Sequence, residues 1–140
     1  MIKVIFKVND YSRIMNLVLL ILRLIIAILM LTHGVPKLEK LITGDFNFPD
    51  PIGLGSTISL ILTVFAQFIC SILIAFGFGT RMAVIPLIIT MVVILLIVHG
   101  DDSMFDHYNV LLYLLGYFIL LITGSGKYSL DYYLNRRNQK

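Results

Sequence analysis

The feature that most constrains this chain is an apolar run over residues 16–34, NLVLLILRLIIAILMLTHG, with Arg23 near its middle. A helix of this length spans the ~30 Å hydrocarbon layer of a bilayer at about 1.5 Å per residue. The sequence therefore predicts a membrane-spanning helix. It also places an arginine at a depth where charge is costly and rarely kept without a use.

Three further apolar runs follow the first. With 59% hydrophobic and 14% charged residues, the 140-residue chain is too apolar for a soluble domain. We predict an all-α polytopic membrane protein, a four-transmembrane-helix bundle formed by a single domain over residues 1–140. The expected spans are residues 14–33, 56–78, 80–99 and 108–123, with an outer loop over 34–55 and a tail over 124–140.

The basic residues favour one side of the membrane. After four crossings, both termini and the turn between the second and third spans face the same side, which carries Lys3, Lys7, Arg13, Arg81, Lys127, Arg136, Arg137 and Lys140. The outer loops carry only Lys37 and Lys40. The positive-inside rule therefore predicts cytoplasmic N- and C-termini. Topology and lipid phosphates explain the net charge of +3, so we expect membrane lipid and no nucleic acid as a partner.

Each predicted span has one polar residue near its centre, namely Arg23, Gln67, Thr90 and Tyr117. No Asp or Glu lies inside the four runs, so Arg23 has no carboxylate partner there. A buried unpaired charge costs several kcal/mol. We therefore expect a polar layer at one depth, where Arg23 meets an electron-rich guest such as a quinone carbonyl, an oxyanion or a lipid headgroup. The alternative is an arginine that is structural or that snorkels to the headgroups.

Two spans carry polar stripes at helical spacing. These stripes are Ser59, Thr63, Gln67, Cys70 and Ser71 in the second span, and Asn109, Tyr113, Gly116 and Tyr117 in the fourth. We expect both stripes to face the interior. Small and hydroxyl residues also let membrane helices approach closely, which is the simpler interpretation for the serines and threonines.

Three polar residues, His33, Lys37 and His99, lie at the outer ends of the first and third spans. They are candidates for the mouth of a pocket, or for hydrogen-bonded helix ends. No HxxxH or HxH pair occurs on one element, and zinc needs a defined set of ligands, so we predict no metal site. A haem held by His33 and His99 is a weaker alternative still. No nucleophile-and-base pair, phosphate loop or cysteine motif appears, so no catalytic residue is assigned.

A set of motifs in order carries a family resemblance. They are Leu22-Arg23-Leu24, His33-Gly34-Val35-Pro36-Lys37-Leu38, Phe48-Pro49-Asp50-Pro51-Ile52-Gly53, Gly77-Phe78-Gly79-Thr80-Arg81-Met82-Ala83 and Gly124-Ser125-Gly126-Lys127-Tyr128-Ser129-Leu130-Asp131. Together, and over about residues 16–134, they resemble the DoxX family.

The resemblance implies a four-helix protein of the bacterial inner membrane, from a family named after small subunits linked to quinol oxidation and thiosulfate:quinone oxidoreduction. It also implies a redox protein partner. The family commonly carries a glutamate where this chain has Gln67 and another where it has Tyr108. Gln67 can form hydrogen bonds but cannot take up a proton, so proton transfer within the bundle is disfavoured here.

The resulting hypothesis is a quinone-linked redox accessory subunit that binds a quinone or another polar headgroup near Arg23. The predicted ligand-binding residues are Arg23, Gln67, His33, Lys37, His99, Tyr113 and Tyr117. Two alternatives stay open: a non-enzymatic membrane scaffold or assembly factor, and a carrier of a small molecule or anion. A carrier is expected to be a homo-oligomer, because four short helices enclose little volume.

Overall fold

A computed structural model of the protein describes residues 8–98 and 104–137. Within these residues every regular element is helical, as predicted. The elements in chain order are α2 (Arg13–Thr43), α3 (Ser56–Val64), η1 (Phe65–Cys70), α4 (Ser71–Phe76), α5 (Thr80–Val93), η2 (Ile94–Val98), α6 (Met104–Thr123) and α7 (Leu130–Arg137). The two η segments are π-helical turns, so α3, η1 and α4 form one continuous helix, and η2 extends α5.

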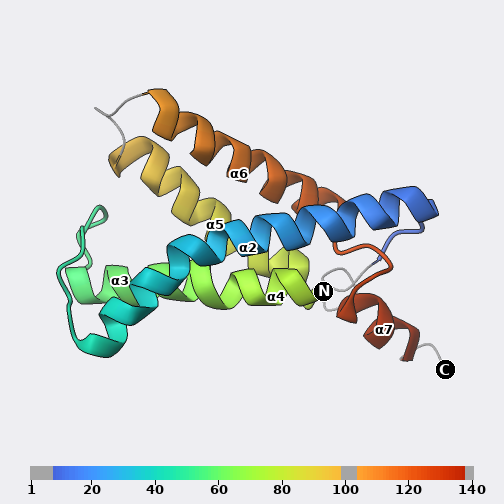
Figure 1. The fold of residues 1–140 in the computed structure, drawn as a ribbon, viewed down its shortest axis with the longest axis horizontal. Helices are drawn as coiled ribbons and strands as arrows, with labels where there is room; N and C mark the ends of the chain where they lie inside the picture. The colour runs from blue at the N-terminus through green and yellow to red at the C-terminus, as the bar shows by residue number, and fades with distance from the viewer. Residues whose placement is uncertain (1–7, 99–103, 138–140) are drawn as a thin grey trace.

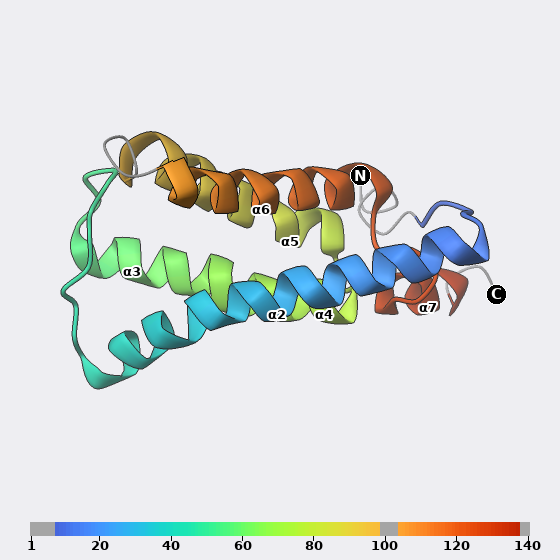
Figure 2. The same ribbon diagram turned by 45° about the horizontal axis from the view of Figure 1, so that its top comes forward.

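The helices form an elongated bundle of two layers (Figures 1 and 2). Helix α2 lies beside α3 and α4, and α5 lies beside α6. The start of α2, the turn between α4 and α5, and α7 share one end, which we call the terminal end. The loop over residues 44–55 lies at the opposite end, which we call the loop end.

Three of these helices are long and apolar enough to cross a membrane by length and composition. They are Arg13–Thr43, Ser56–Phe76 and Thr80–Ile97, and a shorter apolar helix runs over His107–Thr123. Large apolar side chains such as Ile28, Leu115 and Ile122 point out of the bundle and are exposed. An apolar exterior of this kind suits a lipid environment rather than water.

Helix α2 continues past the expected end of the first span. The sequence predicted a loop from residue 34, but the helix runs through Pro36 to Thr43 and ends at Gly44, whose left-handed φ is 78°. A proline inside a helix removes a backbone donor. One residue after Pro36, the Lys37 ammonium donates a hydrogen bond to the backbone carbonyl of His33 at 3.0 Å, within the same helix. The loop therefore begins at Gly44, about three turns later than the predicted boundary at residue 34.

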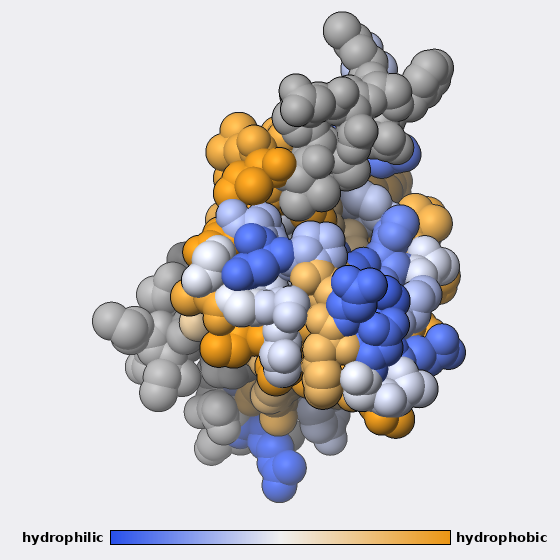
Figure 3. Space-filling model, turned by 90° about the vertical axis from the view of Figure 1, so that its left-hand side faces the viewer, coloured by the Kyte–Doolittle hydropathy of each residue, from blue (hydrophilic) through white to orange (hydrophobic). Residues whose placement is uncertain are grey.

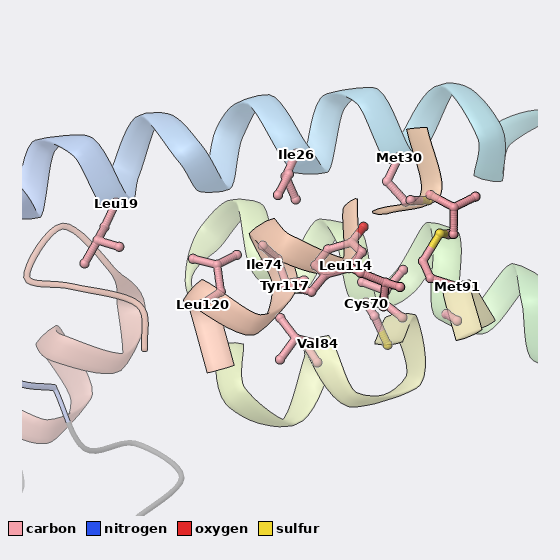
Figure 4. Packing of buried hydrophobic residues seen from close by; sticks show 14 residues of the cluster. Leu19, Ile26, Met30, Cys70, Ile74, Val84, Met91, Leu114, Tyr117 and Leu120 are labelled. Carbon is pink, nitrogen blue, oxygen red and sulfur yellow. The ribbon is translucent and has the colours of Figure 1, made fainter. Parts of the chain in front are cut away.

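The core lies between the two layers, where side chains of α2, η1, α4, α5 and α6 interdigitate (Figure 4). Two glycines allow α2 to approach its neighbours. A Cβ at Gly116 would lie 2.1 Å from Ile26 Cδ1, and a Cβ at Gly34 would lie 2.8 Å from the Gln67 carbonyl oxygen. Gly34 and Gln67 therefore mark a point where the backbones of α2 and η1 almost touch.

Candidate functional site

A cavity of about 750 Å³ lies between the helices toward the loop end. Its walls are apolar side chains of α2, α3, α5, η2 and α6, including Ile26, Met30 and Met91. Phe48, Pro49, Pro51 and Ile52 of the 44–55 loop complete the lining. Figure 3 looks at this end and shows hydrophilic residues beside hydrophobic ones. The volume is within the range of sites for small organic ligands, about 300–1,000 Å³.

Polar groups line this cavity as well: His33, Lys37, Ser59, Thr63, Gln67, Thr90, Asn109 and Tyr113. Three of their hydroxyls already donate to other oxygens. Thr63 donates to the Ser59 carbonyl at 2.7 Å, Thr90 to the Pro86 carbonyl at 2.8 Å, and Ser59 to Asp50 at 2.9 Å. These hydroxyls therefore have no proton left to donate to a ligand, although their oxygens can still accept a hydrogen bond.

Gln67 is different. Its side chain is only 2% exposed, and its Oε1 finds no hydrogen-bond partner among the described residues. A buried polar atom without a partner costs about 1–3 kcal/mol. Its position in the π-helical segment η1 is typical of functional sites in helices. Among the polar side chains that line the cavity, Gln67 is therefore the one with a buried polar atom that lacks a partner among the described residues.

The two tyrosines of the fourth-span stripe have different surroundings. Tyr113 lines the cavity, and its ring meets the His33 ring edge-on with a centroid separation of 6.2 Å. Tyr117, one turn further along α6, stacks on Tyr113 with a centroid separation of 6.2 Å, but it is fully buried and lies outside the cavity lining. Helical spacing placed both on one face and could not distinguish them.

Asp50 shapes the loop that covers the cavity. Its carboxylate accepts hydrogen bonds from the backbone N–H groups of Leu54 at 3.0 Å and Gly55 at 2.8 Å, and from the Ser59 hydroxyl. These donors, the Gly55 N–H above all, lower the pKa of Asp50. The sequence indicates a Pro/Gly-rich loop that lies on the membrane surface or caps the bundle, but it does not show the hydrogen bonds of Asp50.

Arg23 lies away from the cavity, at the terminal end. The side chain is 0% exposed, and its Nη2 donates to the Tyr128 carbonyl. The guanidinium packs on Gly77, where an added Cβ would lie 1.9 Å from Nη1. Its Nε and Nη1 have no hydrogen-bond partner among the described residues. Arg23 thus connects α2 to the end of α4 and to the segment before α7.

Asp131 completes the cluster around Arg23. It is 2% exposed and accepts from the backbone N–H groups of Gly79 at 2.7 Å and Thr80 at 3.3 Å, which caps the start of α5. Burial raises the pKa of this carboxyl above its usual value of 3.8, although the two N–H groups and the positive charge of Arg23 act in the opposite direction. Three of the quoted motifs, far apart in sequence, therefore meet at one place.

The expectation of one polar layer at mid-membrane depth is wrong. Arg23 is level with Gly77, whereas Gln67 is level with Gly34. The eleven residues from Arg23 to Gly34 correspond to about 16 Å along a helix. The reason is that α2 begins at Arg13 and extends beyond the other helices at the terminal end, so the middle of its apolar run is not the middle of the bundle.

Of the seven predicted ligand-binding residues, the structure brings four together on the cavity: His33, Lys37, Gln67 and Tyr113. Arg23 and Tyr117 lie elsewhere, and His99 falls outside the described residues. Binding by any of them stays a prediction. Sequence reasoning missed Phe48 and Ile52 as lining residues, since nothing in a loop sequence shows which face it covers.

The fold defines an all-helical membrane protein with a cavity between its helices. A family model described as DoxX matches residues 18–100, more than half of the chain. The chain therefore belongs to the DoxX family. Comparisons with curated proteins and with solved structures found no match.

Proposed function

We propose that this protein binds a quinone, or a lipid-soluble molecule with a similar polar headgroup, in the cavity at the loop end. In this proposal it is an accessory subunit of a quinone-linked redox system and takes or gives electrons through a partner protein. It crosses the bacterial inner membrane four times with both termini in the cytoplasm. The observation that carries the proposal is Gln67, which lines a cavity with mostly apolar walls and whose buried Oε1 has no hydrogen-bond partner among the described residues.

The chemistry of the lining suits both forms of a quinone. Quinone carbonyls accept hydrogen bonds, and the Lys37 ammonium, the Tyr113 hydroxyl and the Gln67 amide N–H₂ are donors. A quinol hydroxyl donates, and the Gln67 Oε1 is an acceptor without a partner among the described residues. The apolar walls suit the ring and the tail. Because Gln67 takes up no proton, the protons of a quinol must leave through other groups.

Binding of a short-chain ubiquinone analogue to the purified protein in mild detergent tests the proposal. We expect Gln67→Leu, which keeps the volume and removes both hydrogen-bonding groups, to weaken binding about tenfold. Tyr113→Phe should weaken binding, whereas Tyr117→Phe makes the same chemical change outside the cavity and should not. Lys37→Met and Lys40→Met form a second matched pair, because only Lys37 lines the cavity.

The proposal fails if mass spectrometry finds no quinone in the purified protein and the analogue binds wild type and Gln67→Leu equally. Redox coupling needs its own measurement, namely quinol-dependent electron flow in membranes with and without the protein. If electron flow is the same with and without the protein, the accessory role is contradicted, even if the protein binds quinone.

One observation favours a second candidate, a non-enzymatic scaffold or assembly factor. The buried Arg23 serves to hold the C-terminal segment in place, which is a structural rather than a chemical role. A scaffold predicts that cavity variants leave function unchanged, while Lys127→Glu and Arg136→Glu abolish recovery of a partner protein from membranes. Quinone-linked binding predicts the reverse pattern.

A further inference from the structure

A second hollow, of about 390 Å³, lies at the terminal end, far from the quinone cavity. It is formed between the start of α2 and the segment that leads into α7. Its lining consists of Tyr11, Arg13, Asn16, Lys127, Tyr128 and Tyr132, a mixture of cations, phenols and one amide. We call this hollow the basic cleft.

The walls of the basic cleft are tied together by a buried side chain. Asn16 is 2% exposed, and its Nδ2 donates to the carbonyls of Tyr11 and Ser12, each at 2.9 Å. Its Oδ1 accepts from the Lys127 backbone N–H at 2.8 Å, across 111 residues of sequence. The cleft is therefore a product of the tertiary fold and not a chance arrangement of two mobile side chains.

The charges in the cleft suit an anion. Arg13 is exposed and has no ion pair with a described residue, and Lys127 lies near the Tyr132 hydroxyl. Lys127 Nζ also contacts the Asp10 carboxylate at 2.7 Å, but that carboxylate is 92% exposed. Exposed ion pairs of this kind contribute little, so an incoming anion with two or three oxygens competes well.

The phenol groups add donors without adding negative charge. The hydroxyls of Tyr128 and Tyr132 have no hydrogen-bond partner among the described residues. A guanidinium, an ammonium and two hydroxyls around one hollow match the several acceptor oxygens of a phosphate. A carboxylate has only two oxygens and would leave some of these donors unused.

The depth of the cleft agrees with this chemistry. Arg23 is level with Gly77, where α4 ends, and Asn16 lies seven residues further out along α2. Seven residues correspond to about 10 Å of helix. The cleft therefore lies beyond the ends of the packed helices, at the depth of the headgroup layer of a bilayer.

We propose that the basic cleft binds a phosphate-bearing group, either the headgroup phosphate of an anionic phospholipid or a free phosphate. Arg13 and Lys127 supply the charge, and the hydroxyls of Tyr128 and Tyr132 supply further donors. This site is independent of the quinone proposal, because it shares no residue with the cavity at the loop end.

The test uses the full chain in mild detergent and two probes, phosphatidylglycerol and inorganic phosphate, with phosphatidylcholine as a zwitterionic comparison. The cleft variant is Arg13→Gln with Lys127→Gln. Its control is Arg136→Gln with Arg137→Gln, which removes the same charge outside the cleft. The loss of one cation should weaken binding roughly fivefold, so the cleft variant should bind its probe about 25-fold more weakly than wild type. The control variant should lose much less affinity.

Removal of the Asp10 carboxylate should change the affinity for the probe in the opposite direction. Because its carboxylate competes for Lys127, Asp10→Asn should strengthen binding severalfold. If phosphatidylglycerol binds and inorganic phosphate does not displace it, the ligand is a lipid headgroup; displacement by phosphate identifies a free phosphate site. The proposal is overturned if neither probe binds, or if the cleft and control variants lose affinity equally, which indicates diffuse attraction to a basic surface.

Discussion

Arg23 shows how a buried arginine can be accommodated without an acidic residue in any of the four apolar runs. Its charge is placed at the terminal end of the bundle, where the Tyr128 carbonyl accepts one of its hydrogen bonds and Asp131 lies near enough to attract it. Both partners come from the segment after the last apolar helix. The arginine therefore depends on residues about a hundred positions away in the sequence.

Arg23→Leu should lower the free energy of unfolding by about 2–3 kcal/mol, because it leaves the Tyr128 carbonyl and the buried Asp131 carboxylate without their cationic partner. Thermal unfolding in detergent measures the loss. In a double-mutant cycle with Asp131→Asn, we expect a coupling free energy on the order of 1 kcal/mol. Strictly additive effects would show that the two residues do not interact. Quinone binding by folded Arg23→Leu should be unchanged.

Gly77 is the residue on which Arg23 rests. Its φ is 70°, and a Cβ there would lie 1.9 Å from Arg23 Nη1 and 2.5 Å from Ser129 Cβ. Gly77→Ala should therefore be destabilising through both strain and steric clash. Gly44→Ala is the matched control, since its φ is 78° and nothing lies within 4 Å of the added atom.

The control measures the cost of the left-handed conformation alone, about 1–2 kcal/mol. We expect Gly77→Ala to cost at least about 2 kcal/mol more, measured as the difference in thermal stability. Equal losses in the two variants would mean that the guanidinium does not occupy the space beside Gly77.

Among the helices, α2 organises the bundle, because it contacts all three segments of the continuous helix formed by α3, η1 and α4. It comes close to this helix at Gly34, where an added Cβ would meet backbone atoms of Gln67 and Phe68. At Gly116 on α6, an added Cβ meets only the end of the Ile26 side chain. Backbone in a packed helix moves less easily than a side-chain terminus.

Gly34→Ala should therefore destabilise the protein more than Gly116→Ala, although alanine favours a helix by about 1 kcal/mol at either position. Because η1 carries Gln67, Gly34→Ala should also weaken quinone binding. Thermal unfolding and the binding assay measure the two effects. A more stable Gly34→Ala protein would contradict the close approach of α2 and η1.

The cap that Asp131 provides for α5 predicts a dependence on pH. The pKa of this carboxyl is raised on folding, so the folded state binds a proton more readily than the unfolded state. Stability associated with Asp131 should then increase as the pH falls through the folded pKa toward the unfolded value near 3.8.

The measurement compares the thermal midpoints of wild type and Asp131→Asn between about pH 7 and about pH 4. The difference, wild type minus variant, should grow as the pH falls, because the variant has no proton to bind at this position. A difference that shrinks toward low pH would indicate that the carboxylate is stabilised, rather than destabilised, by its buried surroundings.

At the scale of the whole molecule, the polar residues are divided between the two ends. The loop end has a cavity with an unpaired amide, and the terminal end has a closed cluster that ties the C-terminal segment to the bundle. The cavity is suited to a ligand, whereas the closed cluster around Arg23 and Asp131 contributes to stability and lies apart from the lining of the basic cleft.

A chain that stops after Thr123 should therefore fold poorly. It loses the Tyr128 carbonyl, the Asp131 cap and the Asn16 contact with Lys127 together. We expect a loss of stability on the order of 3 kcal/mol or more from the uncompensated Arg23 charge alone. A chain that stops after Arg137 is the control. Equal yield and thermal stability of the two proteins would show that the C-terminal segment is dispensable.

The helices and their apolar character can be predicted from the sequence alone, because the length and hydropathy of each run are local properties. The sequence also identified His33, Lys37, Gln67 and Tyr113, which the tertiary structure brings to one cavity. The position of Arg23 along the bundle follows only from the packing of the helices, because hydropathy does not show how far α2 extends beyond its neighbours. Depth and partners depend on how helices pack against one another, and that packing is set by contacts between residues far apart in the chain.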